Sequence, residues 1–374
     1  MERPLVRPQV LIVGLGGLGG WVLELMARSE GISYLVGADV NEEWGRRKVY
    51  NAASGAMLQG CYPRLEFVRI DLHDVDATAE TLARLQPQLI VNCATLQTWW
   101  LRKGLPSEMA DRLSEAGSGP WVSTHLALSR RLMLAVRESS FRGHVINSGI
   151  PDISNAVLAK RSLAPTIGLG NIDLLISPIR MGVAGRLGVP ARNVSVYAIL
   201  HHCHTSHFRK HTSGAPPYFL RIMVGDQDVT GRFDTDLLLH QVSQDRFSGP
   251  DGNPVVAASG IKNALALLRD IGLLTHSPGP QGLPGGYPVR LSAAGAEVVL
   301  PSGVTMEQAL AYGEAGQRAD GIERIEDDGT VVYTDKAVQI IRDVLGYRLT
   351  PLAFDECDEQ AAELIARFGA LLDA

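Results

Sequence analysis

The chain has 374 residues, which is more than one hydrophobic core usually serves, so we expect two domains. Its net charge of −5 and its pI of about 6.1 are not typical of a protein that binds nucleic acid or an anionic membrane surface. Apolar residues make up 45% of the chain, but they never form the run of roughly 18 to 20 residues that spans a bilayer. We therefore expect neither nucleic acid nor membrane as a partner.

The cysteines also indicate a compartment. Cys61, Cys93, Cys203 and Cys357 are far apart and include no C-x-x-C pair, which is typical of reduced thiols. The first eight residues lead straight into an apolar strand, without the apolar run and cleavage site of a signal peptide. These features predict a cytoplasmic protein.

Short apolar runs alternate with helical patterns in the first half of the chain. The expected strands are 10–13, 34–38, 66–70, 89–93 and 144–147, and the expected helices are 19–28, 77–85 and 122–138. Strands that alternate with helices predict βαβ units and a parallel sheet. The predicted class is therefore α/β, with an N-terminal Rossmann domain, a doubly wound parallel sheet, over residues 1–150.

The second half mixes the two kinds of pattern. Helices are expected over 153–159, 172–187, 262–271, 305–316 and 361–372, and strands over 194–200, 218–224, 232–241, 329–333 and in a hairpin at 289–300. Residues 276–288 are dense in Pro and Gly, so we expect no regular structure there. Thr305 and Gln308 have the spacing of a capping box. These patterns predict an α+β substrate or oligomerisation domain over 151–345, followed by a helical segment, 346–374, that packs back on the first domain.

A glycine-rich loop follows the first expected strand. Gly14, Gly16 and Gly19 form the pattern G-x-G-x-x-G, and Gly17 and Leu18 complete the loop before the helix. In such loops the first glycine makes a tight turn, the second lets a pyrophosphate approach the backbone, and the third lets the helix pack on the strand. The helix N-terminus offers free N–H groups to the phosphates. The loop therefore predicts a dinucleotide site.

An acidic residue ends the second expected strand. Asp39 lies 20 residues after Gly19, where a carboxylate binds the ribose hydroxyls of a dinucleotide. A carboxylate there favours NAD, because it repels the 2′-phosphate of NADP. Arg46 and Arg47 follow a few residues later, so NADP is possible, but an exposed helix accounts for both arginines as well.

Two further strands end in polar or small residues. Asp71 and Leu72 follow the third expected strand and are candidates to flank an adenine; a solvated loop is the alternative. Asn92, Ala94 and Thr95 follow the fourth and leave room for the ribose of a nicotinamide. Ligands bind beyond the carboxyl ends of parallel strands, where both segments are expected.

The first part of the chain resembles the cofactor domain of saccharopine-dehydrogenase-like NAD(P)-binding oxidoreductases. The features that carry this resemblance are the glycine loop, Asp39, the Asp71-Leu-His-Asp74 segment and the run Leu89-Ile-Val-Asn92-Cys-Ala. The resemblance covers residues 8–150. It implies a Rossmann domain joined to an α+β substrate domain, with an active site between them.

Residues 144–208 resemble two other families. The order of features there is similar to that in lactate/malate dehydrogenases and NAD-dependent family 4 glycosidases. The features are Asn147-Ser-Gly-Ile-Pro151, a glycine turn at Gly168, the helical Asp173 and a strand that ends in histidines. Ile176 stands where the dehydrogenases have a substrate-binding arginine, so Arg180 would have to replace it. Asn171 stands where the glycosidases have a metal-binding cysteine.

Five of the ten histidines fall between residues 201 and 211. One interpretation is that His202 or His204 is the general acid or base of a proton transfer, with Asp173 as the carboxylate that orients it. A second is that two or three of these histidines bind a divalent metal, with Cys203 as a further ligand. A third is that they are structural or merely exposed.

The remaining candidates concern the substrate. Trp99 follows the fourth strand and is a candidate to contact the substrate, although a role in packing explains it equally well. Arg180 and Lys210 are candidates to bind an anionic group of the substrate. The leading hypothesis is an oxidoreductase that moves a hydride between NAD, or NADP, and a small polar hydroxy/keto or amino/imino compound. The alternatives are a metal-assisted lyase or hydrolase that uses NAD transiently, and a non-catalytic dinucleotide sensor. Apolar stretches in the second half would suit a homodimer.

Overall fold

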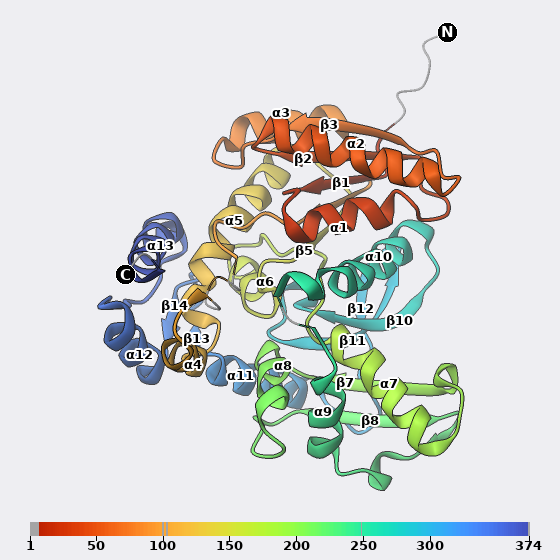
Figure 1. Ribbon diagram of the computed structural model, residues 1–374, viewed down its shortest axis with the longest axis vertical. Coiled ribbons are helices and arrows are strands. Elements are labelled where there is room, and N and C mark those ends of the chain that lie inside the picture. The colour runs from red at the N-terminus through yellow and green to blue at the C-terminus, as the bar shows by residue number, and fades with distance from the viewer. Residues whose placement is uncertain (1–6, 99–100, 102–103, 248, 373–374) are drawn as a thin grey trace.

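The computed structural model describes residues 7–98, 101, 104–247 and 249–372. The first half of the chain forms a sheet covered by helices, and most of the second half forms smaller sheets and helices below it (Figure 1). The C-terminal helices lie at the side, next to helices of the first half (Figure 1). None of the helices in the described part of the chain has the length and apolar character needed to cross a membrane.

A six-stranded parallel sheet forms the centre of the first half. Its strand order is β3-β2-β1-β4-β5-β6, with strands Val10–Val13 (β1), Tyr34–Asp39 (β2), Arg64–Arg69 (β3), Leu89–Asn92 (β4), His144–Asn147 (β5) and Ile167–Gly168 (β6). The chain moves outward in one direction from β1 to β3 and in the other from β4 to β6. A crevice therefore opens at the carboxyl ends of β1 and β4, which is where doubly wound sheets bind ligands. This sheet confirms the predicted fold class, and its last strand comes from beyond residue 150.

Helices cover both faces of this sheet. They are Gly17–Met26 (α1), Glu42–Leu58 (α2), Val75–Leu85 (α3), Val122–Glu138 (α5) and Pro151–Ala159 (α6). A further helix, Ser107–Glu115 (α4), lies away from this sheet and packs against the later helix Asp335–Leu345 (α12). One apolar core joins the sheet to α1, α2 and the later helix Asn253–Arg269 (α10). Another joins it to α3, α5 and the last helix, Cys357–Leu372 (α13). Both halves of the chain thus share cores, because α10 packs against α1.

The second half contains three small antiparallel sheets, with the orders β7-β8-β9, β10-β11-β12 and β13-β14. Its strands are Val194–Ile199 (β7), Phe219–Val224 (β8), Gln227–Asp228 (β9), Leu273–Pro278 (β10), Gly286–Ser292 (β11), Gly295–Val298 (β12), Ile322–Ile325 (β13) and Val331–Tyr333 (β14). Its helices are Asp173–Leu187 (α7), His202–Lys210 (α8), Thr235–Gln244 (α9), Asn253–Arg269 (α10), Met306–Ala319 (α11), Asp335–Leu345 (α12) and Cys357–Leu372 (α13). This is the α+β pattern expected of the second domain.

Helix α13 packs against α5 of the first half. The rings of Trp121 and Phe368 meet edge to face, with their centroids 5.4 Å apart. Arg130 on α5 forms an ion pair with Asp355, just before α13. The last helix therefore packs on the first half of the chain through α5.

Two predicted segments differ from the structure. Residues 232–241 were expected as a strand, but most of them belong to α9. Asp234 caps that helix at Leu237 N, and the buried side chains of Leu239 and Ser243 are four residues apart, on one face of a helix. Residues 276–288 were expected to lack regular structure, but their two ends belong to β10 and β11. Pro278 ends β10 and Pro288 lies within β11. The connection between them holds the other two prolines and the glycines with positive φ, such as Gly279 and Gly285. The elements that were not expected are helices α2, α4, α8 and α12 and strands β6, β9, β10 and β13.

Candidate active site

A cleft of about 1230 Å³ runs along the carboxyl edge of the parallel sheet. Its walls come from both halves of the chain: the glycine loop and the ends of β2, β3 and β4 on one side, and α7, α8 and the start of α10 on the other. The volume exceeds the roughly 300–1,000 Å³ of most ligand pockets, so the cleft has room for a dinucleotide and a second molecule.

The three glycines of the loop are constrained in different ways. Gly14 has a φ of 86°, and a Cβ there would lie 2.6 Å from the backbone N of Ala94. A Cβ on Gly19 would lie 1.8 Å from the carbonyl oxygen of Gly14, so helix α1 packs against the loop only because this residue is glycine. A Cβ on Gly16 would meet nothing within 4 Å, because Gly16 faces the open cleft. Gly17 and Leu18 line the cleft beside it.

Asp39, at the end of β2, connects to this loop. Its carboxylate accepts hydrogen bonds from the backbone N–H groups of Leu15, at 2.7 Å, and Asn41, at 2.9 Å. It also lines the cleft, and each of its two oxygens keeps a lone pair for a further hydrogen bond. Arg46 and Arg47 instead form ion pairs on α2 with Glu42 and Glu43, in exposed positions.

The other cofactor candidates lie at the ends of β3 and β4. Asp71 and Leu72 line the cleft, as do Ala94 and Thr95. Asn92 is buried beneath them, where its side chain accepts a hydrogen bond from Ala94 N and donates to the side chain of Asn147. Asn92 thus shapes the turn after β4, and Ala94 and Thr95 present the surface.

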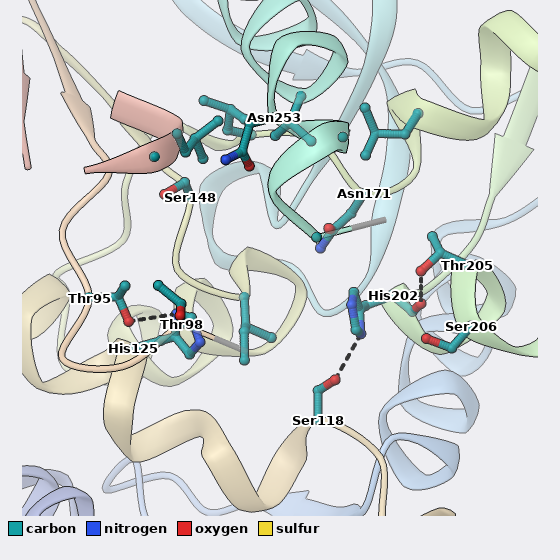
Figure 2. Close-up of a pocket in the computed structure, with 18 of the residues that line it drawn as sticks. Thr95, Thr98, Ser118, His125, Ser148, Asn171, His202, Thr205, Ser206 and Asn253 are labelled. Carbon is teal, nitrogen blue, oxygen red and sulfur yellow. Dashed lines mark hydrogen bonds between the residues drawn. The ribbon is translucent and has the colours of Figure 1, made fainter. Parts of the chain in front are cut away.

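His202 stands in the wall opposite the sheet, at the start of α8. Its Nδ1 lies 2.9 Å from Oδ2 of Asp320, the residue that ends α11, and 3.3 Å from Oγ of Ser118. The side chain of His202 remains 23% exposed, whereas that of Asp320 is 4% exposed. Because Nδ1 is turned toward Ser118 and Asp320, Nε2 lies on the other side of the ring (Figure 2).

The carboxylate of Asp320 is held in its charged form. Burial raises its pKa, but the neighbouring His202 and His201 and the backbone N–H of Ser118 outweigh burial and lower the pKa to about 2. An ionised carboxylate only accepts hydrogen bonds, so Nδ1 of His202 carries the proton in this contact. Nε2 is then the nitrogen of the neutral ring that takes up a proton.

A second histidine lies on the sheet side of the cleft. His125, on α5, has its Nδ1 3.2 Å from Oγ1 of Thr95, and both residues line the cleft. His125 and His202 stand on opposite sides of the pocket, with Ser148, Asn171 and Asn253 around its upper rim (Figure 2).

Several predicted site residues lie elsewhere. His204 is buried: its Nε2 donates to the carbonyl of Pro216 over 3.0 Å, its Nδ1 accepts from His201 N, and burial lowers its pKa to about 4. The carboxylate of Asp173 contacts Lys262, at 2.6 Å, and Ser259, so Asp320 rather than Asp173 is the carboxylate on His202. Arg180 donates to the backbone carbonyl of Ala191.

The other two substrate candidates have different outcomes. Lys210 lines the cleft and forms an ion pair with Asp111, over 2.8 Å. Trp99 lies outside the described residues.

The histidine-rich window does not converge on one point. His202 binds Asp320, His204 binds the carbonyl of Pro216, and His207 binds that of Ser213. In the described part of the chain, no three or more His, Cys, Asp or Glu side chains gather closely enough to hold a metal ion. The metal interpretation of this window therefore has no ligand set in the structure.

Sequence reasoning missed Ser118, His125 and Asp320. None belongs to a motif: Ser118 and Asp320 lie in connections that end or begin helices, and His125 is one polar residue in a long, mostly apolar helix. Asp320 and His202 are 118 residues apart in the chain. Only the fold brings them together.

Known proteins match this chain in structure and not in sequence. No family model matches it, and no curated protein does. Among solved structures, a lactate dehydrogenase from a Medee basin deep-sea metagenome library is 14% identical, with a TM-score of 0.58 over 84% of this chain and 97% of that one. The malate dehydrogenase of Cryptosporidium parvum is 15% identical, with a TM-score of 0.58 over 84% and 98%.

A third structure is the lactate dehydrogenase of Eimeria maxima, which was solved with NADH and oxamate. It is 16% identical, with a TM-score of 0.59 over 84% of this chain and 92% of that one. At these identities the likeness shows the fold. The chain has the two-part Rossmann fold of these dehydrogenases over most of its length.

Proposed function

We propose that the protein is an NAD-dependent oxidoreductase that acts on a small polar hydroxy/keto or amino/imino substrate. The observation that carries the proposal is a single cleft with an open glycine loop on one wall and the His202–Asp320 pair on the other. The fold of lactate and malate dehydrogenases, one of them solved with NADH and oxamate, supports the same reading.

The residues of the loop fit a dinucleotide. The space in front of Gly16 is free of protein atoms, so a pyrophosphate can approach the backbone there, at the N-terminus of α1. Two backbone N–H groups hold the carboxylate of Asp39 where it would accept hydrogen bonds from the ribose hydroxyls. Asp71, Leu72, Ala94 and Thr95 would flank the two ends of the cofactor.

NAD is favoured over NADP for reasons of charge. The carboxylate of Asp39 would repel a 2′-phosphate. The arginines that follow it are already paired with Glu42 and Glu43 on the same helix. Among the described residues, α2 therefore places no positively charged side chain in the wall of the cleft to counter that repulsion.

His202 is the group we assign to proton transfer. NAD supplies or accepts the hydride when it is bound. His202 holds a proton at Nε2 and gives it to the substrate oxygen or nitrogen during reduction, or takes it up during oxidation. Asp320 is a positioning residue, because its contact with Nδ1 orients the ring and stabilises the imidazolium form. Lys210 remains a candidate for binding a substrate anion at the far end of α8.

Calorimetric titration with NADH tests the cofactor site. The wild-type protein should bind NADH, and Gly16→Ala should weaken binding about tenfold or more without lowering the melting temperature, because the new methyl group meets only the ligand. Gly19→Ala is the matched control: its methyl group would strike the carbonyl of Gly14, so it should lower the melting temperature. Failure of the wild type to bind either NADH or NAD would contradict the proposal.

Turnover tests the catalytic assignment. With any carbonyl compound that the wild type reduces, His202→Gln should lower kcat by about 100-fold to 10,000-fold and leave the Kd for NADH unchanged. Near-normal kcat in this variant would show that another group moves the proton.

A further inference from the structure

Two arginines line the part of the cleft that is formed by the second half of the chain. Arg209 belongs to α8, and Arg246 follows the end of α9. One guanidinium nitrogen of Arg209 donates to the backbone carbonyl of Phe247 over 3.0 Å, which fixes that side chain beside Arg246. The Nη1 atom of Arg246 is buried and has no hydrogen-bond partner among the described residues.

These two positive charges are not balanced by acidic side chains. Burial lowers the pKa of Arg246 to about 10, with the nearby charge of Arg209 as a further cause, and burial lowers the pKa of Arg209 as well. Neither arginine forms an ion pair with a described residue, whereas the neighbouring Lys210 is already paired with Asp111. A partly buried, unpaired cation costs free energy, so such a pair is typical of a site that an anion completes.

The helix α8 sets the spacing between this pair and His202. Arg209 comes seven positions after His202 in α8, which is about 10 Å along the helix axis. This offset places the two residues on almost the same face of the helix. Thr205 and Ser206, one turn after His202, also line the cleft (Figure 2). The face of α8 thus leads from the proton-transfer group to the arginines without leaving the cleft.

We propose that Arg209 and Arg246 bind a carboxylate or phosphate group at the end of the substrate that is remote from the reacting carbon. The inference rests on the function proposed above and names its substrate class. The substrate is an elongated hydroxy/keto or amino/imino compound whose anionic group lies several bonds from the carbon that exchanges hydride. A three-carbon hydroxy acid, whose carboxylate stands on the carbon next to the reacting one, lies outside this class.

Binding of small anions tests this subsite without turnover. Inorganic phosphate and glutarate are titrated calorimetrically, at low ionic strength, into the full-length protein with and without saturating NADH. The wild type should bind at least one of the two, and the one that binds more tightly identifies the group. Arg209→Gln and Arg246→Met should each weaken that binding about tenfold or more, because a charge-assisted hydrogen bond is lost. Arg246→Met keeps the apolar stem, and melting temperatures check that both variants fold.

Arg221→Gln is the matched control. Arg221 lies on β8, pairs with Asp228 and does not line the cleft, so its loss should leave anion binding unchanged. The proposal is overturned if the wild type binds neither anion, or if both cleft variants bind as the wild type does. Because the titration without NADH reads the anion alone, a failure of NADH binding would refute the proposed cofactor and leave the result on the subsite standing.

Discussion

At the scale of single residues, Asp320 shows how hydrogen bonds keep a buried carboxylate ionised. Its carboxylate accepts hydrogen bonds from Ser118 N, at 2.7 Å, and from Nδ1 of His202, at 2.9 Å. These contacts keep its pKa near 2 although burial opposes ionisation. A carboxylate in this state fixes which nitrogen of His202 carries the proton, which is a condition for proton transfer at the other nitrogen.

Replacing Asp320 by Asn tests this link by NMR. In the wild type the neutral ring of His202 should carry its proton on Nδ1, as ¹⁵N–¹H correlation spectra report. Asp320→Asn should shift the tautomer toward Nε2–H and move the titration of the ring to lower pH, because the charge that favours the imidazolium is gone. Ser118→Ala keeps both the carboxylate and the backbone donor, so its spectra should change little. An unchanged tautomer and titration in Asp320→Asn would refute the positioning role.

At the scale of elements, helix α11 carries Asp320 to the site. The helix begins with a complete capping box: Thr305 Oγ1 accepts from Gln308 N over 3.2 Å, and Gln308 Oε1 accepts from Thr305 N over 3.0 Å. It ends at Asp320, whose N–H still bonds to the last turn. The sequence predicted this box, and the structure confirms it. A local signal therefore anchors one end of a helix whose other end supplies the partner of His202.

Removing the N-cap should lower the stability of the fold and leave NADH binding unchanged. Thr305→Ala should lower the free energy of unfolding by about 1 kcal/mol, because the N–H of Gln308 loses its acceptor. Thr305→Ser keeps a hydroxyl and should lose much less. Urea denaturation gives both values, and NADH binding of the folded variants should stay as in the wild type. Equal losses in the two variants would show that the hydroxyl is not what stabilises the start of the helix.

At the scale of the whole molecule, buried neutral histidines link folding to pH. His276 is buried, and its Nε2 accepts a hydrogen bond from Ala198 N over 3.2 Å, so it must be unprotonated there. Burial, together with the charge of Lys262, lowers its pKa to about 3, and burial lowers that of His204 to about 4. Between the ordinary histidine pKa of about 6.5 and these values the unfolded chain binds more protons than the folded one. The fold therefore loses stability as the pH falls through this range.

The slope of this loss can be measured. The free energy of unfolding of the wild type should fall between pH 6.5 and pH 4, by up to about 1.4 kcal/mol per pH unit for each buried histidine. His276→Gln keeps an acceptor but cannot take a proton, so its slope should be shallower by about that amount. His73→Gln, at an exposed position, is the control and should follow the wild type. A slope that His276→Gln leaves unchanged would refute the assignment.

Local patterns were enough for much of the first half of the chain. The expected ranges 10–13, 122–138 and 144–147 agree with the bounds of β1, α5 and β5, and the glycine loop lies between β1 and α1 as predicted. These features depend on neighbours within a few residues: the alternation of apolar runs, the steric freedom of glycine and the caps of helices. The sequence by itself therefore determined five of the six strands of the sheet and the position of the glycine loop.

The wall of the cleft that holds His202 and Asp320 depended on the tertiary structure. A histidine window in the sequence does not tell which ring meets a carboxylate, and the pairing of His202 with Asp320 rather than Asp173 joins residues 118 positions apart. Arg246 likewise reaches Arg209 only because α8 packs against α9. Such contacts are selected by the packing of whole elements, which minimises exposed apolar surface without leaving a trace in any short stretch of chain. Hence the glycine loop can be recognised in the sequence, whereas the His202–Asp320 pair and the proposed anion subsite depend on the tertiary structure.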